Sequence, residues 1–221
     1  MGISAILLTD SRFPGGGHVH SGGLEEALSR GLIREPEDLP GFLRGRLWTA
    51  GRLTAAFAAA AVGCREWTRL DAELDARTPS PAQREASRAQ GRGTARAGRA
   101  AWPSPVLDQL LAATPRPHHP IVIGALTGIC GGAPRDAALA VAYLAVSGPA
   151  SAAVRLLGFD PFTVNAMVAA LASDLEAVAD EAAGHAATDP ARLPSPGSPA
   201  LDLLAEAHRR RHEEEVRLFA S

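Results

Sequence analysis

The chain has 221 residues, of which 46% are hydrophobic and only 5% aromatic, so its core must be built from alanine, leucine and valine. Its 22 basic and 24 acidic residues nearly cancel, which gives no global reason to expect a nucleic acid or an anionic membrane as partner. Every basic residue is an arginine. Without lysine, the chain cannot form a Walker-type nucleotide loop or a Schiff base with a substrate.

The spacing of apolar residues predicts helices along the whole chain and no pair of strands. A short helix over residues 3–11 and a second over 24–33 precede a long one that runs from residues 36–38 to about Leu74. Further helices are expected at 82–101, 106–113, 121–132, 136–157 and 163–183. The predicted fold class is all-α, a compact helical bundle with a mobile C-terminal segment.

Proline and serine gather at residues 188–199, which we interpret as a linker. It separates an all-helical domain, residues 1–187, from an amphipathic tail, residues 200–221. The tail ends in Leu218 and Phe219. Apolar side chains on a mobile tail usually dock on the body or on another protein, so this tail is expected to bind a partner.

Residues 137–154 carry no charge and raise the question of a membrane span. The stretch is rich in alanine, glycine and serine and contains Pro149, so a buried helix is the favoured interpretation. The N-terminus lacks the charged start, apolar stretch and cleavage site of a secretory leader, and we expect a cytoplasmic protein.

Glycines and histidines are concentrated between residues 15 and 20, and three interpretations stay open. Backbone N–H groups of Gly15–Gly17 can cradle a phosphate, although neither a strand nor a lysine flanks them. His18 and His20 can share a transiently bound metal ion such as nickel with a carboxylate of the Glu25–Glu26 pair. Alternatively, the glycines form a corner, and His20 and Ser21 cap the following helix.

Five arginines recur at helical spacing between residues 84 and 99 and would line one face of a helix. A nucleic acid is one possible partner, but the stretch lacks aromatic residues that stack on bases. An acidic protein surface or pairing with the chain's own carboxylates fits the pattern as well. We call these five residues the arginine stripe: Arg84, Arg88, Arg92, Arg96 and Arg99.

We expect the remaining histidines to lie at the protein surface. His118 and His119 lie between prolines and are expected in a solvated turn. His185, His208 and His212 lie in or near charged helices, where exposure is the expectation. No serine or cysteine has the frame of a known nucleophile motif, so the sequence assigns no catalytic residue.

Several stretches together resemble the UreF family of urease accessory proteins. The stretch DSRFPGGGHVHSGGLE resembles that family's D-S-x-x-P-x-G-x-x-x-H-S-x-G-L-E signature. REASRAQGR, HHPIVIGALTGICG, YLAVSGPASAAVRLLG and the terminal RLFAS are similar to later segments of the family, in the same order. The signature residues are Asp10, Ser11, Pro14, Gly16, His20, Ser21, Gly23, Leu24 and Glu25.

The resemblance implies an all-α, dimeric assembly factor that is not an enzyme and has no cofactor of its own. Such a protein bridges a UreD- or UreH-type scaffold and the GTPase UreG, and couples GTP hydrolysis to nickel insertion into apo-urease. On this hypothesis neither nucleic acid nor membrane is a partner. The residues expected at partner or dimer surfaces are Asp10, Ser11, Pro14, Gly16, His20, Ser21, Glu25, Arg84, Arg88, Arg92, Arg217, Leu218 and Phe219.

Three other functions remain as alternatives. The chain can be a nickel- or metal-binding protein in its own right that uses His18 and His20. It can be a nucleic-acid binder that uses the arginine stripe, in which case its affinity should fall steeply with salt. It can also be a hydrolase whose catalytic residues are distant in the sequence.

Overall fold

The computed structural model describes residues 3–16 and 20–219. Every regular element within these ranges is helical, which confirms the all-α prediction. The α-helices are α1 (Ile3–Thr9), α2 (Leu24–Ser29), α3 (Leu39–Arg46), α4 (Arg52–Ala61), α5 (Trp67–Ala76), α6 (Pro81–Ala101), α7 (Pro105–Ala113), α8 (His119–Ile129), α9 (Pro134–Leu157), α10 (Pro161–Ala170), α11 (Ala172–Gly184) and α12 (Pro199–Phe219). Short elements η2 (Pro36–Asp38), η3 (Leu47–Gly51, a π-helix) and η4 (Pro190–Arg192) lie between them.

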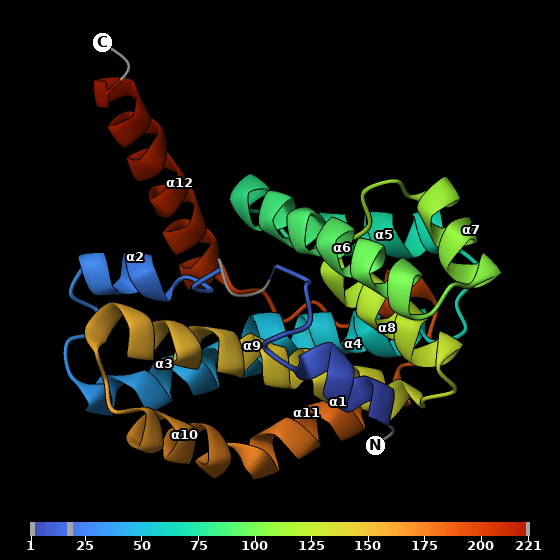
Figure 1. The fold of residues 1–221 in the computed structure, drawn as a ribbon, viewed down its shortest axis with the longest axis horizontal. Coiled ribbons are helices and arrows are strands. Elements are labelled where there is room, and N and C mark those ends of the chain that lie inside the picture. The colour runs from blue at the N-terminus through green and yellow to red at the C-terminus, as the bar shows by residue number, and fades with distance from the viewer. Residues whose placement is uncertain (1–2, 17–19, 220–221) are drawn as a thin grey trace.

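Helices α4 and α9 run through the middle of the bundle, with α10 and α11 along one side and α5 to α8 grouped at one end (Figure 1). α4 contacts α8, α9 and α11 at once. Every residue of α4 from Ala55 to Ala61 is buried, and all but Phe57 are alanines. Small side chains allow three helices to approach the same one closely, so the scarcity of aromatic residues is compatible with a dense core.

The closest approach joins α4 to α8 at Gly124. A Cβ atom added to Gly124 would lie 2.2 Å from the carbonyl oxygen of Ala58 and 2.6 Å from Cβ of Ala61. No side chain fits between two backbones at that distance. The glycine that weakens α8 as a free helix is therefore required by tertiary packing.

The predicted long helix is wrong at its C-terminal end. η2, α3, η3 and α4 follow one another from Pro36 to Ala61, but Gly63 then adopts a left-handed φ of 78°. A residue in this conformation ends a helix, and α5 starts separately at Trp67. The apolar spacing continues across the break because both helices bury leucines in the same core cluster.

The predicted helix over 163–183 is also two helices. α10 and α11 meet at Leu171 with a bend of 46°. The bend lets the pair follow the surface of α9, along the lower edge of the bundle in Figure 1. Leu171 itself is buried at the bend.

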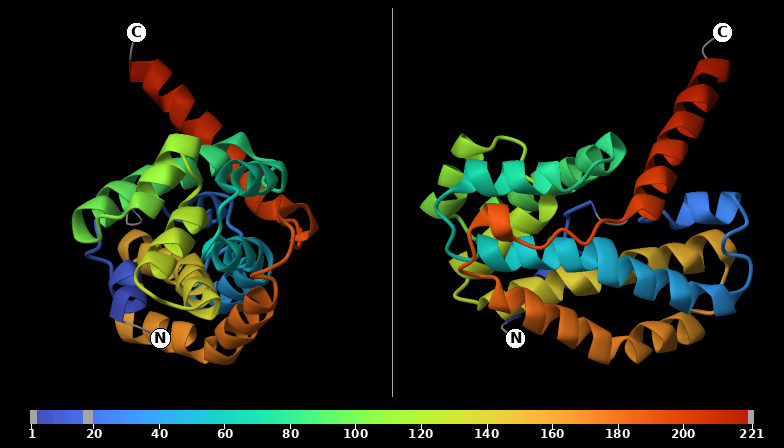
Figure 2. Two further views of the ribbon diagram at one scale, coloured as in Figure 1. Left: turned by 90° about the vertical axis from the view of Figure 1, so that its right-hand side faces the viewer. Right: turned by 180° about the vertical axis from the view of Figure 1, so that it is seen from behind.

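The segment interpreted as a linker lies along α5. Asp189 accepts a hydrogen bond of 2.6 Å from Arg69 Nη2, and Arg77 Nη2 donates to the carbonyl oxygen of Ala191 at 2.8 Å. Leu193 is buried. α12 follows; its first half contacts α2 and α6, and its far end stands clear of the bundle (Figure 2). The division into domain, linker and tail stays a prediction.

Within the described residues, α9 is long and apolar enough to cross a membrane, and the bent α10–α11 pair is a second candidate. The apolar window of α9 has a mean hydropathy of 1.6, and 56% of it is buried inside the bundle. That burial agrees with the prediction of a core helix.

Substituting Gly124→Ala should lower the free energy of unfolding by about 1–3 kcal/mol, because the added methyl group overpacks the α4–α8 contact. Gly45→Ala in α3 is the matched control, since a Cβ atom there meets nothing within 4 Å and alanine favours the helix. Urea unfolding followed by circular dichroism measures both. Equal stability of the two variants would contradict the proposed contact.

Candidate partner-binding surface

The N-terminal loop (residues 10–16 and 20–23) begins with an exposed turn. The carboxylate of Asp10 accepts hydrogen bonds from the backbone N–H of Arg12 at 2.8 Å and from its Nη2 at 2.6 Å. These bonds lower the pKa of Asp10 to about 2. Ser11 and Pro14 are exposed, and Gly16 has a left-handed φ of 77°. The first part of the signature therefore leaves polar and apolar groups open to another molecule.

The next part of the loop is held against α6. The ring of Phe13 stacks near Trp102, with centroids 6.2 Å apart. A Cβ atom on Gly15 would lie 2.7 Å from Thr94 Oγ1, and one on Gly93 would lie 3.0 Å from the carbonyl oxygen of Gly15. These two glycines thus allow a backbone-to-backbone contact.

Arg46 fastens the end of the loop to α9. Its Nη1 donates to the carbonyl oxygen of Gly22 at 2.7 Å, and its Nε donates to that of Ala145 at 2.9 Å. Pro149 has no N–H, so the carbonyl of Ala145, four residues earlier, lacks its helical donor and takes one from Arg46 instead. Burial lowers the pKa of Arg46 to about 10, which still leaves it protonated at neutral pH. Nothing in the sequence singled out this arginine.

The capping prediction for α2 holds in part. Gly23, with a left-handed φ of 94°, occupies the N-cap in place of His20 or Ser21, but Ser21 Oγ accepts a long hydrogen bond of 3.4 Å from the backbone N–H of Glu25 in the first turn. Glu25 faces His208 and His212 of α12. His20 lies close enough to His119 to lower the pKa of that residue. His18 lies outside the described residues.

Arg88 does not face solvent; it ties α6 to α5. Its Nη2 donates to Asp71 and to Asp75, each at 2.8 Å. His118 completes the cluster: Nε2 lies 3.0 Å from Asp75 Oδ1, and Nδ1 lies 3.0 Å from Ser87 Oγ. His118 is only 1% exposed, so the prediction of a solvated turn is wrong. Two prolines beside histidines gave no sign of this burial.

The other four arginines of the stripe differ in their contacts: two bond within the chain and two are exposed. Arg99 pairs with Asp108 at 2.5 Å, and Arg84 Nη1 donates to the carbonyl oxygen of Thr78 at 2.7 Å. Arg92 and Arg96 are exposed. Pairing within the chain, one of the three interpretations of the stripe, therefore holds for Arg84, Arg88 and Arg99.

The first half of α12 is fixed at the N-terminus of α6. The carboxylate of Glu206 accepts from Ser80 Oγ at 2.6 Å and from the backbone N–H of Ala82 at 2.9 Å. Gln83 Nε2 donates to Asp202 at 3.0 Å. Negative charge at a helix N-terminus is stabilising because the first N–H groups lack helical partners. No local sequence pattern indicates either carboxylate, because their partners lie more than a hundred residues earlier.

The predicted tail contacts lie beyond this docked half. The backbone of α12 extends through Arg217 and Leu218 to Phe219. The side chains of these three residues lie outside what the structure describes, so their partner-binding role stays a prediction.

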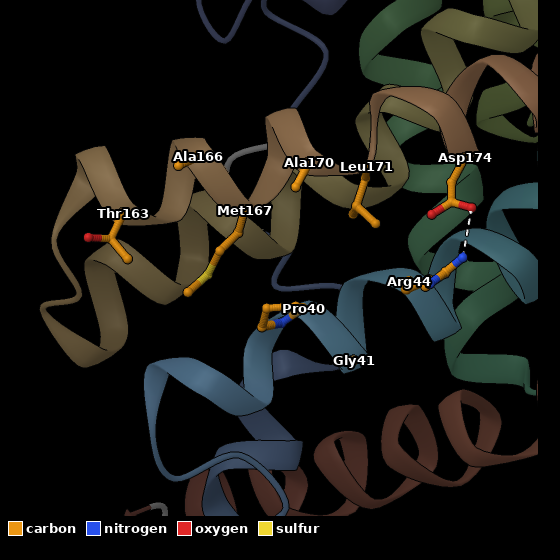
Figure 3. Close-up of a pocket in the computed structure, with 9 residues that line it drawn as sticks. All are labelled: Pro40, Gly41, Arg44, Thr163, Ala166, Met167, Ala170, Leu171 and Asp174. Atoms are coloured by element: carbon orange, nitrogen blue, oxygen red, sulfur yellow. Dashed lines mark hydrogen bonds and ion pairs between the residues drawn. The ribbon is translucent and has the colours of Figure 1, made fainter.

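A groove of about 580 Å³ lies between α3 and the α10–α11 pair (Figure 3). Its lining is mostly apolar, and Arg44 and Asp174 close one end with an ion pair of 3.2 Å. A mostly apolar lining with a few polar groups is typical of a binding site. The lining residues are Pro40, Gly41, Arg44, Thr163, Ala166, Met167, Ala170, Leu171 and Asp174.

An all-helical body, a loop of close backbone contacts and a projecting terminal helix define a protein with surfaces for binding other macromolecules. The family model of UreF matches residues 33–172. The chain is 45% identical over 217 residues to the urease accessory protein UreF of Mycobacterium sp. (strain JLS), covering 98% of this chain and 97% of that protein. It is 44% identical over 221 residues to UreF of Mycobacterium bovis (strain BCG / Pasteur 1173P2), covering 98% of each. The chain therefore belongs to the UreF family of urease accessory proteins, as its motifs predict.

The free energy of unfolding should depend on pH, because the ring of His119 is held neutral in the folded protein. Burial, and then the nearby His20, lowers its pKa from 6.5 to about 4, so the unfolded chain takes up the proton first. The neutral ring contributes fully to the free energy of unfolding above pH 6.5, and this contribution is lost as the pH falls towards 4. His119→Gln should give a shallower fall in melting temperature over this window, with the wild-type slope above it. An unchanged slope below pH 6.5 would contradict the assignment.

Proposed function

We propose that this chain bridges a UreD- or UreH-type protein and the GTPase UreG, and that it couples GTP hydrolysis to nickel insertion into apo-urease. Membership of the UreF family carries the proposal, because the relatives matched over nearly the whole chain are urease accessory proteins. The proposed state is a cytoplasmic homodimer without a cofactor or catalytic residues. Nucleic acid and membrane are not among its proposed partners.

The chain's chemistry supports a role as a binding protein. It contains no lysine, so the phosphate-binding loop of a P-loop GTPase must belong to another chain. A bridging protein can act on such a GTPase by binding its nucleotide states with different affinities. That difference alone shifts the equilibrium between the states and requires no catalytic group from the bridging chain.

The distribution of contacts supports a choice of partner-binding surfaces. The far end of α12 extends beyond the bundle, whereas its first half is fixed on α6 by Asp202 and Glu206 (Figure 2). A helix anchored at one end presents its other end in a defined direction. The exposed turn at Ser11 and Pro14 lies on the same chain segment that contacts α6 and α9. We assign the far end of α12 to the UreD-type partner.

The internal pairing of the arginine stripe argues against the nucleic-acid alternative. Three of its five members use their charge within the chain, which leaves Arg92 and Arg96 to meet phosphates. Non-specific nucleic-acid binding depends on many such contacts together.

The bridge is tested by co-purification. A tagged UreD-type protein should retain UreG only when this chain is present. Retention of UreG at the same level without the chain would contradict the proposed bridge.

Deleting Leu218–Ser221 should weaken retention by the UreD-type protein at least about tenfold. Burying one leucine or phenylalanine side chain is worth about 1.5–3 kcal/mol, and a factor of ten needs about 1.4 kcal/mol. Val106→Ala is the control, because it removes an exposed apolar group from α7 instead. Undiminished binding of the truncated chain, with its helical content unchanged, would rule out the tail assignment.

A further inference from the structure

Two histidines of α12 face the first turn of α2. His208 and His212 are one helical turn apart, and their rings meet edge to face with centroids 4.3 Å apart. A carboxylate oxygen of Glu25 and one nitrogen of each ring all lie within 4.8 Å of one another. Histidines four residues apart on a helix point to the same side, which is the arrangement that helical metal sites use.

The spacing is close to what one ion requires. Four-coordinate zinc is tetrahedral and binds imidazole nitrogen and carboxylate oxygen at about 2.0–2.2 Å, so two of its ligands lie about 3.4 Å apart. The three groups must therefore close by at most about 1.4 Å. His212 is exposed and Glu25 is half-buried, so both side chains have room to make this adjustment.

A buried carboxylate beside the cluster also indicates a cation. Glu26 is 4% exposed; its Oε1 accepts from Arg30 Nε at 2.8 Å, but its Oε2 has no hydrogen-bond partner. That oxygen forms an ion pair of 3.4 Å with Arg211 Nη1. An ionised oxygen buried without a hydrogen bond is costly, and a neighbouring positive ion offsets that cost.

Arg211 lies among these groups but holds them loosely. Its Nη2 is 3.5 Å from Glu25 Oε1 and 3.5 Å from His208 Nδ1. Both distances exceed those of ordinary N–H···O hydrogen bonds, which fall at about 2.7–3.2 Å. The guanidinium group sits on a flexible side chain at the surface, so it can move into solvent when an ion with shorter bonds enters.

We propose that Glu25, His208 and His212 bind one divalent transition-metal ion, which fastens α12 to α2. Two imidazoles and one carboxylate favour zinc, nickel or copper over magnesium and calcium, which prefer oxygen ligands alone. Three protein ligands leave coordination positions for water or for a ligand from another molecule, so the bound ion is exchangeable. The inference stands on these residues and does not depend on the partners proposed above.

The experiment is equilibrium dialysis of the full chain, without a polyhistidine tag, against Ni²⁺ and, separately, Zn²⁺. We expect one ion per chain, and no comparable binding of Mg²⁺. His212→Gln should weaken binding at least about tenfold, since losing an outer-shell partner alone costs roughly 10–100-fold. His185→Gln, at the end of α11, is the matched control and should bind as the wild type does.

Hydrogen exchange gives a second reading that does not depend on the measured affinity. Because His212 is exposed, His212→Gln should leave the fold intact. Ni²⁺ should slow exchange of the amides in residues 205–213 of the wild type but not of His212→Gln. Absence of stoichiometric binding, or equal affinity in His212→Gln, would overturn the site. Binding without slower exchange in the wild type would overturn the fastening of α12.

Discussion

The backbone contact between α4 and α8 determines where the rest of the molecule lies. Gly124 places α8 directly against the carbonyl of Ala58. α6 packs against the start of α8 and the turn before it, since a Cβ atom on Gly91 would lie 2.0 Å from the carbonyl oxygen of Pro117 and 3.1 Å from the backbone nitrogen of His119. The N-terminus of α6 then holds α12 through Glu206. The direction of the terminal helix thus depends on a series of contacts that begins at two small residues in the core.

Much of the N-terminal motif holds the loop in place within the fold. Its glycines allow contact with α6 and α9. Arg46 donates a hydrogen bond to the carbonyl oxygen of Ala145, which Pro149 cannot donate because it has no N–H. Burial of the Arg46 guanidinium costs desolvation energy, but its hydrogen bonds to the carbonyl oxygens of Gly22 and Ala145 fix the loop in one position. Among the described residues of the motif, Ser11 and Pro14 remain exposed and accessible to a partner.

The elements were predictable where the signal is local. Pro134 and Pro161 start α9 and α10 as expected, because proline suits the first turn of a helix. The breaks at Gly63 and Leu171 were missed, because apolar spacing continues across a turn when the helices on both sides bury apolar residues in one core.

Contacts between segments that are distant in the chain could not be predicted from the sequence. The burial of His118 depends on Asp75 and Ser87, and the cluster at Glu25 depends on α12 folding back beside α2. Arginine spacing predicted a shared helix face correctly but could not show which members find carboxylates on α5 and α7. The family itself was recognisable, because its motifs follow one another in the expected order along the chain.

We propose that this chain acts by joining other proteins during urease maturation. This proposal can be tested by activating purified apo-urease with nickel, GTP, UreG and the UreD-type protein, with and without this chain. We expect urease activity only in the complete mixture and no GTP hydrolysis by the isolated chain. Equal activation without the chain, or GTP hydrolysis by the chain alone, would contradict it.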